Sequence, residues 1–165
     1  MARKVFYSFH YKPDNWRVSQ VRNIGSIEGN QPAKDNDWET ITKAGDKEIQ
    51  KWIDDQLYGR SCTIVLIGAN TSERKWINYE IKKTWDSNKG ILGIYIHNLK
   101  GSDGNKSSQG ANPFAAFTIN EGKTNLSSVV KAYNPPYLDS KEVYNYISSN
   151  ISDWIDEAII IRNAN

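Results

Sequence analysis

Hydrophobic positions along the chain follow two spacings, one typical of buried strands and the other typical of helices. Residues 62–67 and 91–96 are nearly continuous apolar runs, which indicate strands buried on both faces of a parallel sheet. Residues 5–9 form a β-branched and aromatic run that predicts a first strand. Apolar residues recur at helical spacing over residues 38–57 and 75–88. Because strands alternate with helices, we expect an α/β fold with a doubly wound parallel sheet and helices on both faces.

The segments between these elements are more polar. A short helix is predicted over residues 15–23, with Asp14 as its N-cap. Residues 25–37 and 100–112 are polar and contain several glycines, which is typical of surface loops. A short edge strand is predicted at residues 129–130.

The C-terminal part of the chain predicts a long helix over residues 139–162. Asp139 and Glu142 have the spacing of a capping box at its start. One apolar stripe then continues along the helix, formed by Val143, Ile147, Ile151, Trp154, Ile155 and Ile159. No internal repeat or linker divides the sequence, so we expect a single domain over residues 1–165.

Composition and charge exclude several classes of protein. The chain has 21 Lys and Arg against 19 Asp and Glu, and no run of basic residues is longer than two, which argues against a nucleic-acid binder. No apolar run is long enough to span a membrane, and the N-terminal residues lack the apolar segment of a signal peptide. With a single cysteine, Cys62, and two histidines, we expect neither a disulfide framework nor a metal site. These features predict a cytoplasmic protein.

In an open parallel sheet, ligands bind at the carboxyl ends of the strands. The residues that follow the predicted strands contain no GxGxxG and no GxxxxGK[ST] pattern, which excludes dinucleotide and P-loop sites. The acids that a phosphate-receiver domain needs after its first and central strands are missing. The first loop also lacks the hydroxyl-rich and glycine-rich character of a flavin phosphate site.

Glu80 occupies an unusual position on the helix predicted over residues 75–88. At about 100° per residue, Ile77 and Ile81 face the sheet, and Glu80 projects between Ile77 and Trp76. An acid therefore lies at the margin of the apolar stripe. The alternative is a boundary glutamate that reaches solvent and pairs with Lys83 or Thr84 at helical spacing.

The segment around Glu80 resembles a known motif. Residues 72–81, SERKWINYEI, are similar to the Ser…Trp-x-x-x-Glu-[Ile/Leu] motif of TIR domains. Three further segments resemble the TIR strands that surround this motif, namely residues 4–9, 59–68 and 90–96. The sequences of residues 6–11, 65–68 and 112–114 are similar to the corresponding segments of the TIR-like proteins of bacterial Thoeris antiphage defence. The resemblance covers residues 3–115.

This resemblance implies a three-layer, flavodoxin-like and TIR-like fold with a mostly parallel sheet. In TIR enzymes that cleave NAD+, the motif glutamate is catalytic, and that role carries over to Glu80. The implied substrate-binding residues are Ser8, Phe9, His10, Trp38, Ser72 and Trp76. Phe9 can equally be a core residue, His10 a solvated loop residue and Ser72 a helix N-cap. Residues 25–37 do not match the usual second TIR strand and its loop.

The resemblance implies an enzyme that consumes NAD+ as its substrate, without a further cofactor, and makes an ADP-ribose-derived nucleotide, cyclic or conjugated. That product would act on a separate effector protein, with a phage trigger and a homo-oligomer that forms on activation. Two alternatives stay open. One is a non-catalytic TIR-like signalling module, and the other is a hydrolase similar to nucleoside deoxyribosyltransferases.

Overall fold

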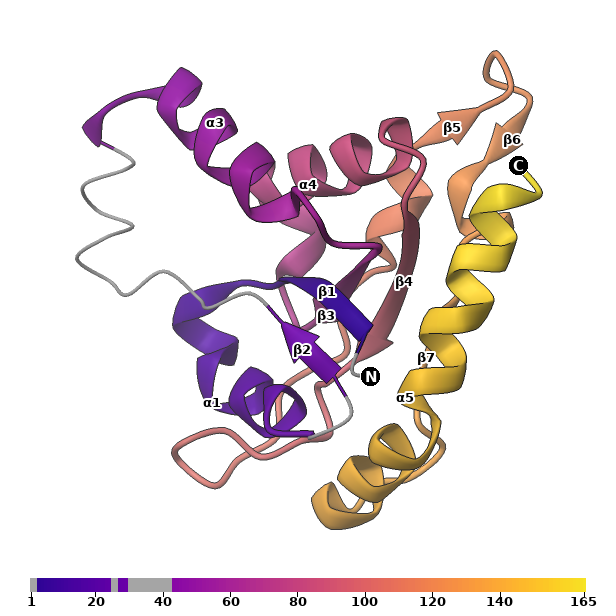
Figure 1. The fold of residues 1–165 in the computed structure, drawn as a ribbon. Coiled ribbons are helices and arrows are strands. Elements are labelled where there is room, and N and C mark those ends of the chain that lie inside the picture. The colour runs from indigo at the N-terminus through magenta and orange to yellow at the C-terminus, as the bar shows by residue number, and fades with distance from the viewer. Residues whose placement is uncertain (1–2, 25–26, 30–42) are drawn as a thin grey trace.

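The computed structural model describes residues 3–24, 27–29 and 43–165, which include a five-stranded parallel sheet. Its strand order is β2-β1-β3-β4-β7 (Figure 1). The strands are β1 (Arg3–Ser8), β2 (Ile27–Gly29), β3 (Cys62–Ile67), β4 (Gly90–Tyr95) and β7 (Ala132–Tyr133). This is the order of a flavodoxin-like doubly wound sheet. A separate antiparallel pair is formed by β5 (Thr118–Ile119) and β6 (Thr124–Asn125).

Helices cover both faces of the sheet and complete three layers. The α-helices are α1 (Tyr11–Arg22), α3 (Asp46–Leu57), α4 (Lys75–Asp86) and α5 (Ser140–Asn163). Helices α1 and α5 lie on one face of the sheet, and α3 and α4 lie on the opposite face (Figure 1). Side chains of α1 and α5 share one core cluster, and those of α3 and α4 belong to two others. Short 3-10 turns lie at Thr71–Glu73, Pro113–Ala116 and Leu126–Ser128. The predicted α/β, TIR-like fold class is therefore confirmed.

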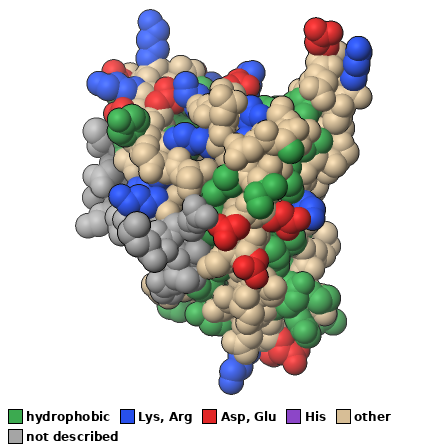
Figure 2. Space-filling view, turned by 45° about the vertical axis from the view of Figure 1, so that its right-hand side comes forward, with side chains coloured by type: hydrophobic (Ala, Val, Ile, Leu, Met, Phe, Trp, Pro, Cys, Tyr) green, Lys and Arg blue, Asp and Glu red, His purple; other side chains and the backbone are tan. Residues whose placement is uncertain are grey.

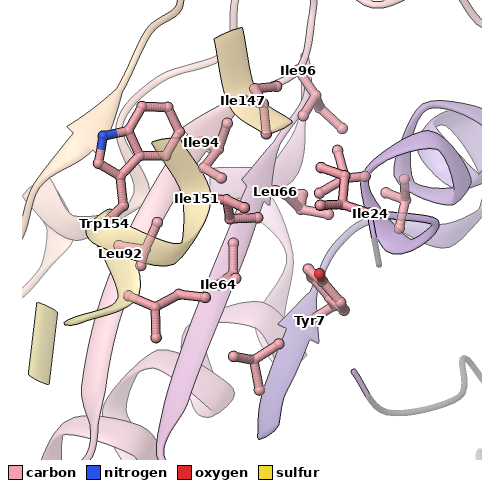
Figure 3. Close-up of a cluster of buried hydrophobic side chains, with 14 of the residues drawn as sticks. Tyr7, Ile24, Ile64, Leu66, Leu92, Ile94, Ile96, Ile147, Ile151 and Trp154 are labelled. Carbon is pink, nitrogen blue, oxygen red and sulfur yellow. The ribbon is translucent and has the colours of Figure 1, made fainter. Parts of the chain in front are cut away.

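The central strands are buried on both faces, as their apolar composition predicted. All six residues of β3 and all six of β4 are buried. On one face, Ile64 and Leu66 of β3 meet Ile147 and Ile151 of α5, with Trp154 at the edge of the cluster (Figure 3). Burying a side chain of this size contributes about 1.5–3 kcal/mol, so this cluster is a major source of stability.

Strand β1 sends alternate side chains to opposite faces of the sheet. Val5 and Tyr7 belong to the cluster under α1 and α5, whereas Phe6 packs with Ile49 and Ile53 of α3. This alternation follows from the two-residue period of a strand.

The first helix begins earlier than predicted. It spans Tyr11–Arg22 with His10 as its N-cap, so the assignment of Asp14 as the cap is wrong. Pro13 is tolerated in the first turn because the backbone N–H groups there have no partner within the helix. Asp14 instead lies inside the helix and is buried.

Two predictions about the sheet edges are wrong. Residues 25–37 were expected to form a loop, but β2 (Ile27–Gly29) lies within them and pairs in parallel with β1. At the other edge, the strand expected at residues 129–130 is β7 (Ala132–Tyr133), and Val130 is a buried residue that precedes it. Residues 38–42, the start of the predicted second helix, lie outside the described residues.

The long C-terminal helix is confirmed. The Asp139 side chain accepts a hydrogen bond of 3.1 Å from the Glu142 backbone N–H, as expected of an N-cap. Five of the six residues predicted for the apolar stripe are buried, and the sixth, Ile159, packs at the margin of the core.

The loop over residues 100–112 contains no helix or strand, as predicted, and crosses close to the carboxyl end of β3. A Cβ atom added to Gly110 would lie 2.1 Å from the backbone oxygen of Gly68. No real Cβ contact is so short, so either the loop or the end of β3 would have to move.

We expect Gly110→Ala to lower the free energy of unfolding by about 1–3 kcal/mol, the usual cost of forcing atoms into a closely packed position. Urea denaturation checks this value, with Ser108→Ala, an exposed position in the same loop, as the control. Equal stability of the two variants would show that the loop does not pack against β3 in solution.

Basic, acidic and hydrophobic side chains are interspersed on the face of the molecule shown in Figure 2. In the part of the chain that the structure describes, no helix is both long and apolar enough to cross a membrane.

Candidate active site

The switch point of the sheet lies between β1 and β3, where the strand order changes direction. Ligands of doubly wound folds bind in the crevice outside the carboxyl ends of the strands at such a point. Ser8 is the last residue of β1, and its Cα lies opposite that of Val65 in β3. Side chains that gather near Ser8 are therefore candidates for a binding or catalytic site.

Glu80 lies at this point and is buried, with 8% of its surface exposed. It belongs to the buried face of α4 together with Ile77, Ile81 and Thr84, as the helical spacing predicted. The Ser8 hydroxyl donates a hydrogen bond to Oε2 of Glu80. The alternative of a solvent-reaching glutamate is thus wrong, because the carboxyl group turns toward the end of β1.

Burial controls the protonation of this carboxyl group. It raises the pKa of Glu80 from an ordinary 4.5 to about 8, and the hydrogen bond from Ser8 opposes the rise. The charged form is disfavoured because little water remains to solvate it. Near neutral pH the ligand-free carboxyl group therefore holds its proton, and a cation placed beside it would favour ionisation.

Two threonines fix the turn of α4 that carries Glu80. The Thr84 hydroxyl donates a 2.7 Å hydrogen bond to the backbone oxygen of Glu80. The hydroxyl groups of Thr84 and Thr63 lie 2.7 Å apart and share a hydrogen bond between α4 and β3. These contacts are fully buried and hold the helix in register with the sheet.

Trp76 lies one turn before Glu80, at the contact between α3 and α4. Its ring meets Tyr79 edge-on at 5.7 Å, and the Lys75 ammonium lies 4.8 Å from the ring centre. It is half-buried against a hydrophobic cluster formed by Phe6, Ile49, Ile53 and Leu57. The helix thus brings Trp76 near Glu80 and also gives it a packing role.

Comparison with known families identifies the fold more closely. Residues 6–101 match the family described as "Thoeris protein ThsB, TIR-like domain". The chain belongs to this TIR-like domain family. The resemblance expected from the motif around Glu80 is confirmed.

A relative in this ThsB family is the protein named "Putative cyclic ADP-D-ribose synthase ThsB1" from Bacillus cereus (strain MSX-D12). It is 40% identical over 119 residues, which cover 69% of this chain. The aligned part is 62% of the relative, so this chain spans about three fifths of the length of that protein.

The ThsB-type fold does not bring all the predicted substrate-binding residues together. Phe9 packs against the core cluster under α1 and α5, which lies on the opposite face of the sheet from Glu80. Phe9 therefore has the position of a core residue, which was the alternative to a substrate-binding role. His10 is half-buried at the start of α1. Trp38 lies outside the described residues.

Ser72 is not the N-cap of the helix that carries Glu80. It lies half-buried in the 3-10 turn Thr71–Glu73, and Arg74 is the residue before the first turn of α4. The N-cap alternative is wrong, and a substrate-binding role for Ser72 stays a prediction. The place of Glu80 between Trp76 and the apolar stripe also predicts a pocket bordered by Phe9 and Trp76, and this pocket stays a prediction.

Sequence reasoning missed a second buried charged group at the same end of the sheet. Asp14 is 1% exposed and lies 3.5 Å from Nη1 of Arg17. Arg17 also donates 2.8 Å hydrogen bonds to the backbone oxygens of Leu99 and Asn105, which tie the loop over residues 100–112 to α1. An acid and an arginine three positions apart, on the apolar face of a helix, are the signal that predicts such a pair.

Among the described residues, no group of three or more His, Cys, Asp or Glu side chains has the arrangement of a metal site. Two buried carboxyl groups lie at this end of the sheet: Asp14 is beside Arg17, whereas Glu80 is held by the Ser8 hydroxyl. The chemistry that Glu80 can support is that of one carboxylate in a poorly hydrated environment.

Proposed function

We propose that this protein is an NAD+-consuming TIR enzyme of antiphage defence. It cleaves the bond between nicotinamide and ribose, and it makes an ADP-ribose-derived signalling nucleotide, cyclic or conjugated. One observation carries the proposal: the carboxyl group of Glu80 is buried at the switch point of the sheet and held by a hydrogen bond from Ser8.

The chemistry of this bond suits one carboxylate. Nicotinamide leaves as a neutral base from a cationic precursor, so no acid has to protonate it. Ordinary glycosides differ because one of two carboxyl groups must protonate their leaving group. Positive charge develops on the ribose as the bond breaks, and a fixed carboxylate in a site with little water stabilises that charge. The reaction proposed here requires no metal or other cofactor.

The environment of Glu80 also favours a cationic substrate. Since burial raises the pKa of Glu80 to about 8, the neutral form dominates at rest. A nicotinamide–ribose cation beside the group favours its ionised form, and substrate binding then releases a proton. The carboxylate is therefore generated where a positive charge is present.

The family supports the same activity. The relative at 40% identity is named "Putative cyclic ADP-D-ribose synthase ThsB1", and the aligned region contains most of this chain. By analogy with the family, we propose that the product acts on a separate effector protein. A phage component as trigger, self-assembly on activation and a cytoplasmic location belong to the same proposal.

The decisive experiment incubates the purified protein with NAD+, with and without lysate from phage-infected cells. Released nicotinamide is measured by chromatography, and nucleotide products are identified by mass spectrometry. Deoxynucleosides are offered as competing substrates. Nicotinamide release supports the proposal, whereas release of free bases from deoxynucleosides alone identifies a different N-glycosidic hydrolase. No turnover under any condition contradicts the enzyme proposal and favours the signalling module.

A further inference from the structure

The contact between Ser8 and Glu80 assigns a more specific role to the serine. Ser8 is 1% exposed, and its hydroxyl donates its proton to Oε2 of Glu80. A hydroxyl with so little exposed surface, and with its proton already directed to a carboxyl oxygen, presents little of itself to a substrate. Its position on the α3 and α4 face is fixed by the strand alternation that also places Phe6 there.

We propose that Ser8 is a positioning residue for Glu80 and not a ligand of the substrate. Its hydrogen bond engages Oε2, fixes the orientation of the carboxyl group and favours its charged form, while Oε1 serves the ribose. This inference rests on the proposed function of Glu80 as the group that stabilises positive charge on the ribose.

The other charged side chains near α4 are directed to different partners. On α3, Asp46 lies 2.8 Å from the Lys75 ammonium. Asp54, also on α3, accepts a 2.9 Å hydrogen bond from the Tyr79 hydroxyl and lies 3.9 Å from the Lys83 ammonium.

At the same end of the sheet, His10 is half-buried at the start of α1, and Asp14 and Arg17 lie 3.5 Å apart on that helix. None of these groups contributes to the shift in the pKa of Glu80, which is set by burial and by the hydrogen bond from Ser8. Within the described residues, the serine hydroxyl is thus the polar group that favours the charged carboxylate.

Removing the hydroxyl should therefore change the pH dependence of the enzyme. A hydrogen bond to a charged group is worth enough to move a titration midpoint by about one pH unit. In Ser8→Ala the pKa of Glu80 should rise further, and the acid limb of the pH profile of kcat/KM should move about one unit toward higher pH. Near pH 7, kcat/KM should then fall about tenfold, while KM at high pH stays close to the native value.

Two measurements test the assignment. The first is the pH profile of nicotinamide release for the native protein, Ser8→Ala and the control Ser61→Ala, which removes an exposed serine hydroxyl at the other end of β3. Ser8→Thr, which restores a hydroxyl, should return the acid limb toward its native position. The second measurement needs no activity. It follows the carboxyl carbon of Glu80 by carbon-13 NMR as the pH is raised, with the signal assigned by its loss in Glu80→Gln.

The outcomes separate this inference from the proposed function. A higher NMR midpoint in Ser8→Ala together with a shifted activity profile supports the positioning role. An unchanged midpoint with a raised KM overturns it and makes Ser8 a substrate ligand. If the NMR midpoint shifts but the protein never releases nicotinamide, Ser8 still controls the ionisation of Glu80. The enzyme proposal is then wrong, and Ser8 has no role in catalysis.

Discussion

Replacing Glu80 by glutamine should lower NAD+ turnover by about two to three decades without disturbing the fold. Glutamine has nearly the same size and can still accept the hydrogen bond from Ser8, but it carries no charge. If the carboxylate stabilises positive charge on the ribose, its loss costs about 3–4 kcal/mol in the transition state, the scale measured for single electrostatic stabilisers. Binding of NAD+ should survive within a few fold, because an amide can still bind the ribose hydroxyls.

The measurement is single-turnover release of nicotinamide, together with the affinity for NAD+ from calorimetry. A matched control is Glu48→Gln, which removes the same charge from an exposed position on α3. Loss of rate with retained binding marks an interaction made mainly in the transition state. Full production of the signalling nucleotide by Glu80→Gln would show that the charge is irrelevant, and the catalytic role would pass to another residue.

Much of the fold follows from burial patterns that the sequence records. The continuous apolar run at β3 predicted its bounds, and the stripe on α5 predicted the face that packs on the sheet. Strand β2 left no such pattern, because it has three residues and joins the sheet through main-chain hydrogen bonds with β1. A strand that short carries too few side chains to show alternation.

The site was predictable where a residue broke a local pattern. Glu80 was found because an acid at the margin of an apolar helical stripe is unusual. Its hydrogen bond with Ser8 joins residues 72 positions apart, and it depends on how α4 docks on the sheet. No local pattern contains that information.

The face of the sheet on which Phe9 lies could have been predicted from the alternation of side chains along β1. Val5 and Tyr7 face α1 and α5, so the next residue of the same parity, Phe9, is directed to that side. Ser8 has the opposite parity and faces α4. The prediction of the substrate-binding residues treated the residues at the end of β1 as one group and overlooked this difference.

The second large effect expected of Glu80 is a fall in stability as pH rises. Its pKa is about 8 in the folded protein and about 4.5 as an ordinary carboxyl group. Between these values the folded chain holds a proton that the unfolded chain has lost, so raising the pH favours unfolding. The slope is about 1.4 kcal/mol per pH unit for one group, which amounts to about 4 kcal/mol between pH 5 and 8.

Two other buried groups titrate near this pH range, and they determine the pH interval in which the change in stability reports on Glu80. Burial raises the pKa of Asp14 to about 6, so its contribution to the loss of stability is complete near that pH. Burial lowers the pKa of His97 below an ordinary 6.5, so this group acts in the opposite direction and only at lower pH. Between about pH 6.5 and 8, Glu80 is the group of these three that still titrates, and it should remove about 2 kcal/mol.

Urea denaturation of the native protein and Glu80→Gln at about pH 5, 6.5 and 8 measures this effect directly. The contributions of Asp14 and His97 are common to both proteins and cancel in the difference between them. We expect the native free energy of unfolding to fall relative to that of Glu80→Gln at each step, whereas Glu48→Gln should follow the native curve. Because the experiment needs neither NAD+ nor a trigger, parallel curves for native protein and Glu80→Gln would mean that the carboxyl group is solvated and already ionised. Glu80 would then lack the low-water environment on which its proposed catalytic role depends.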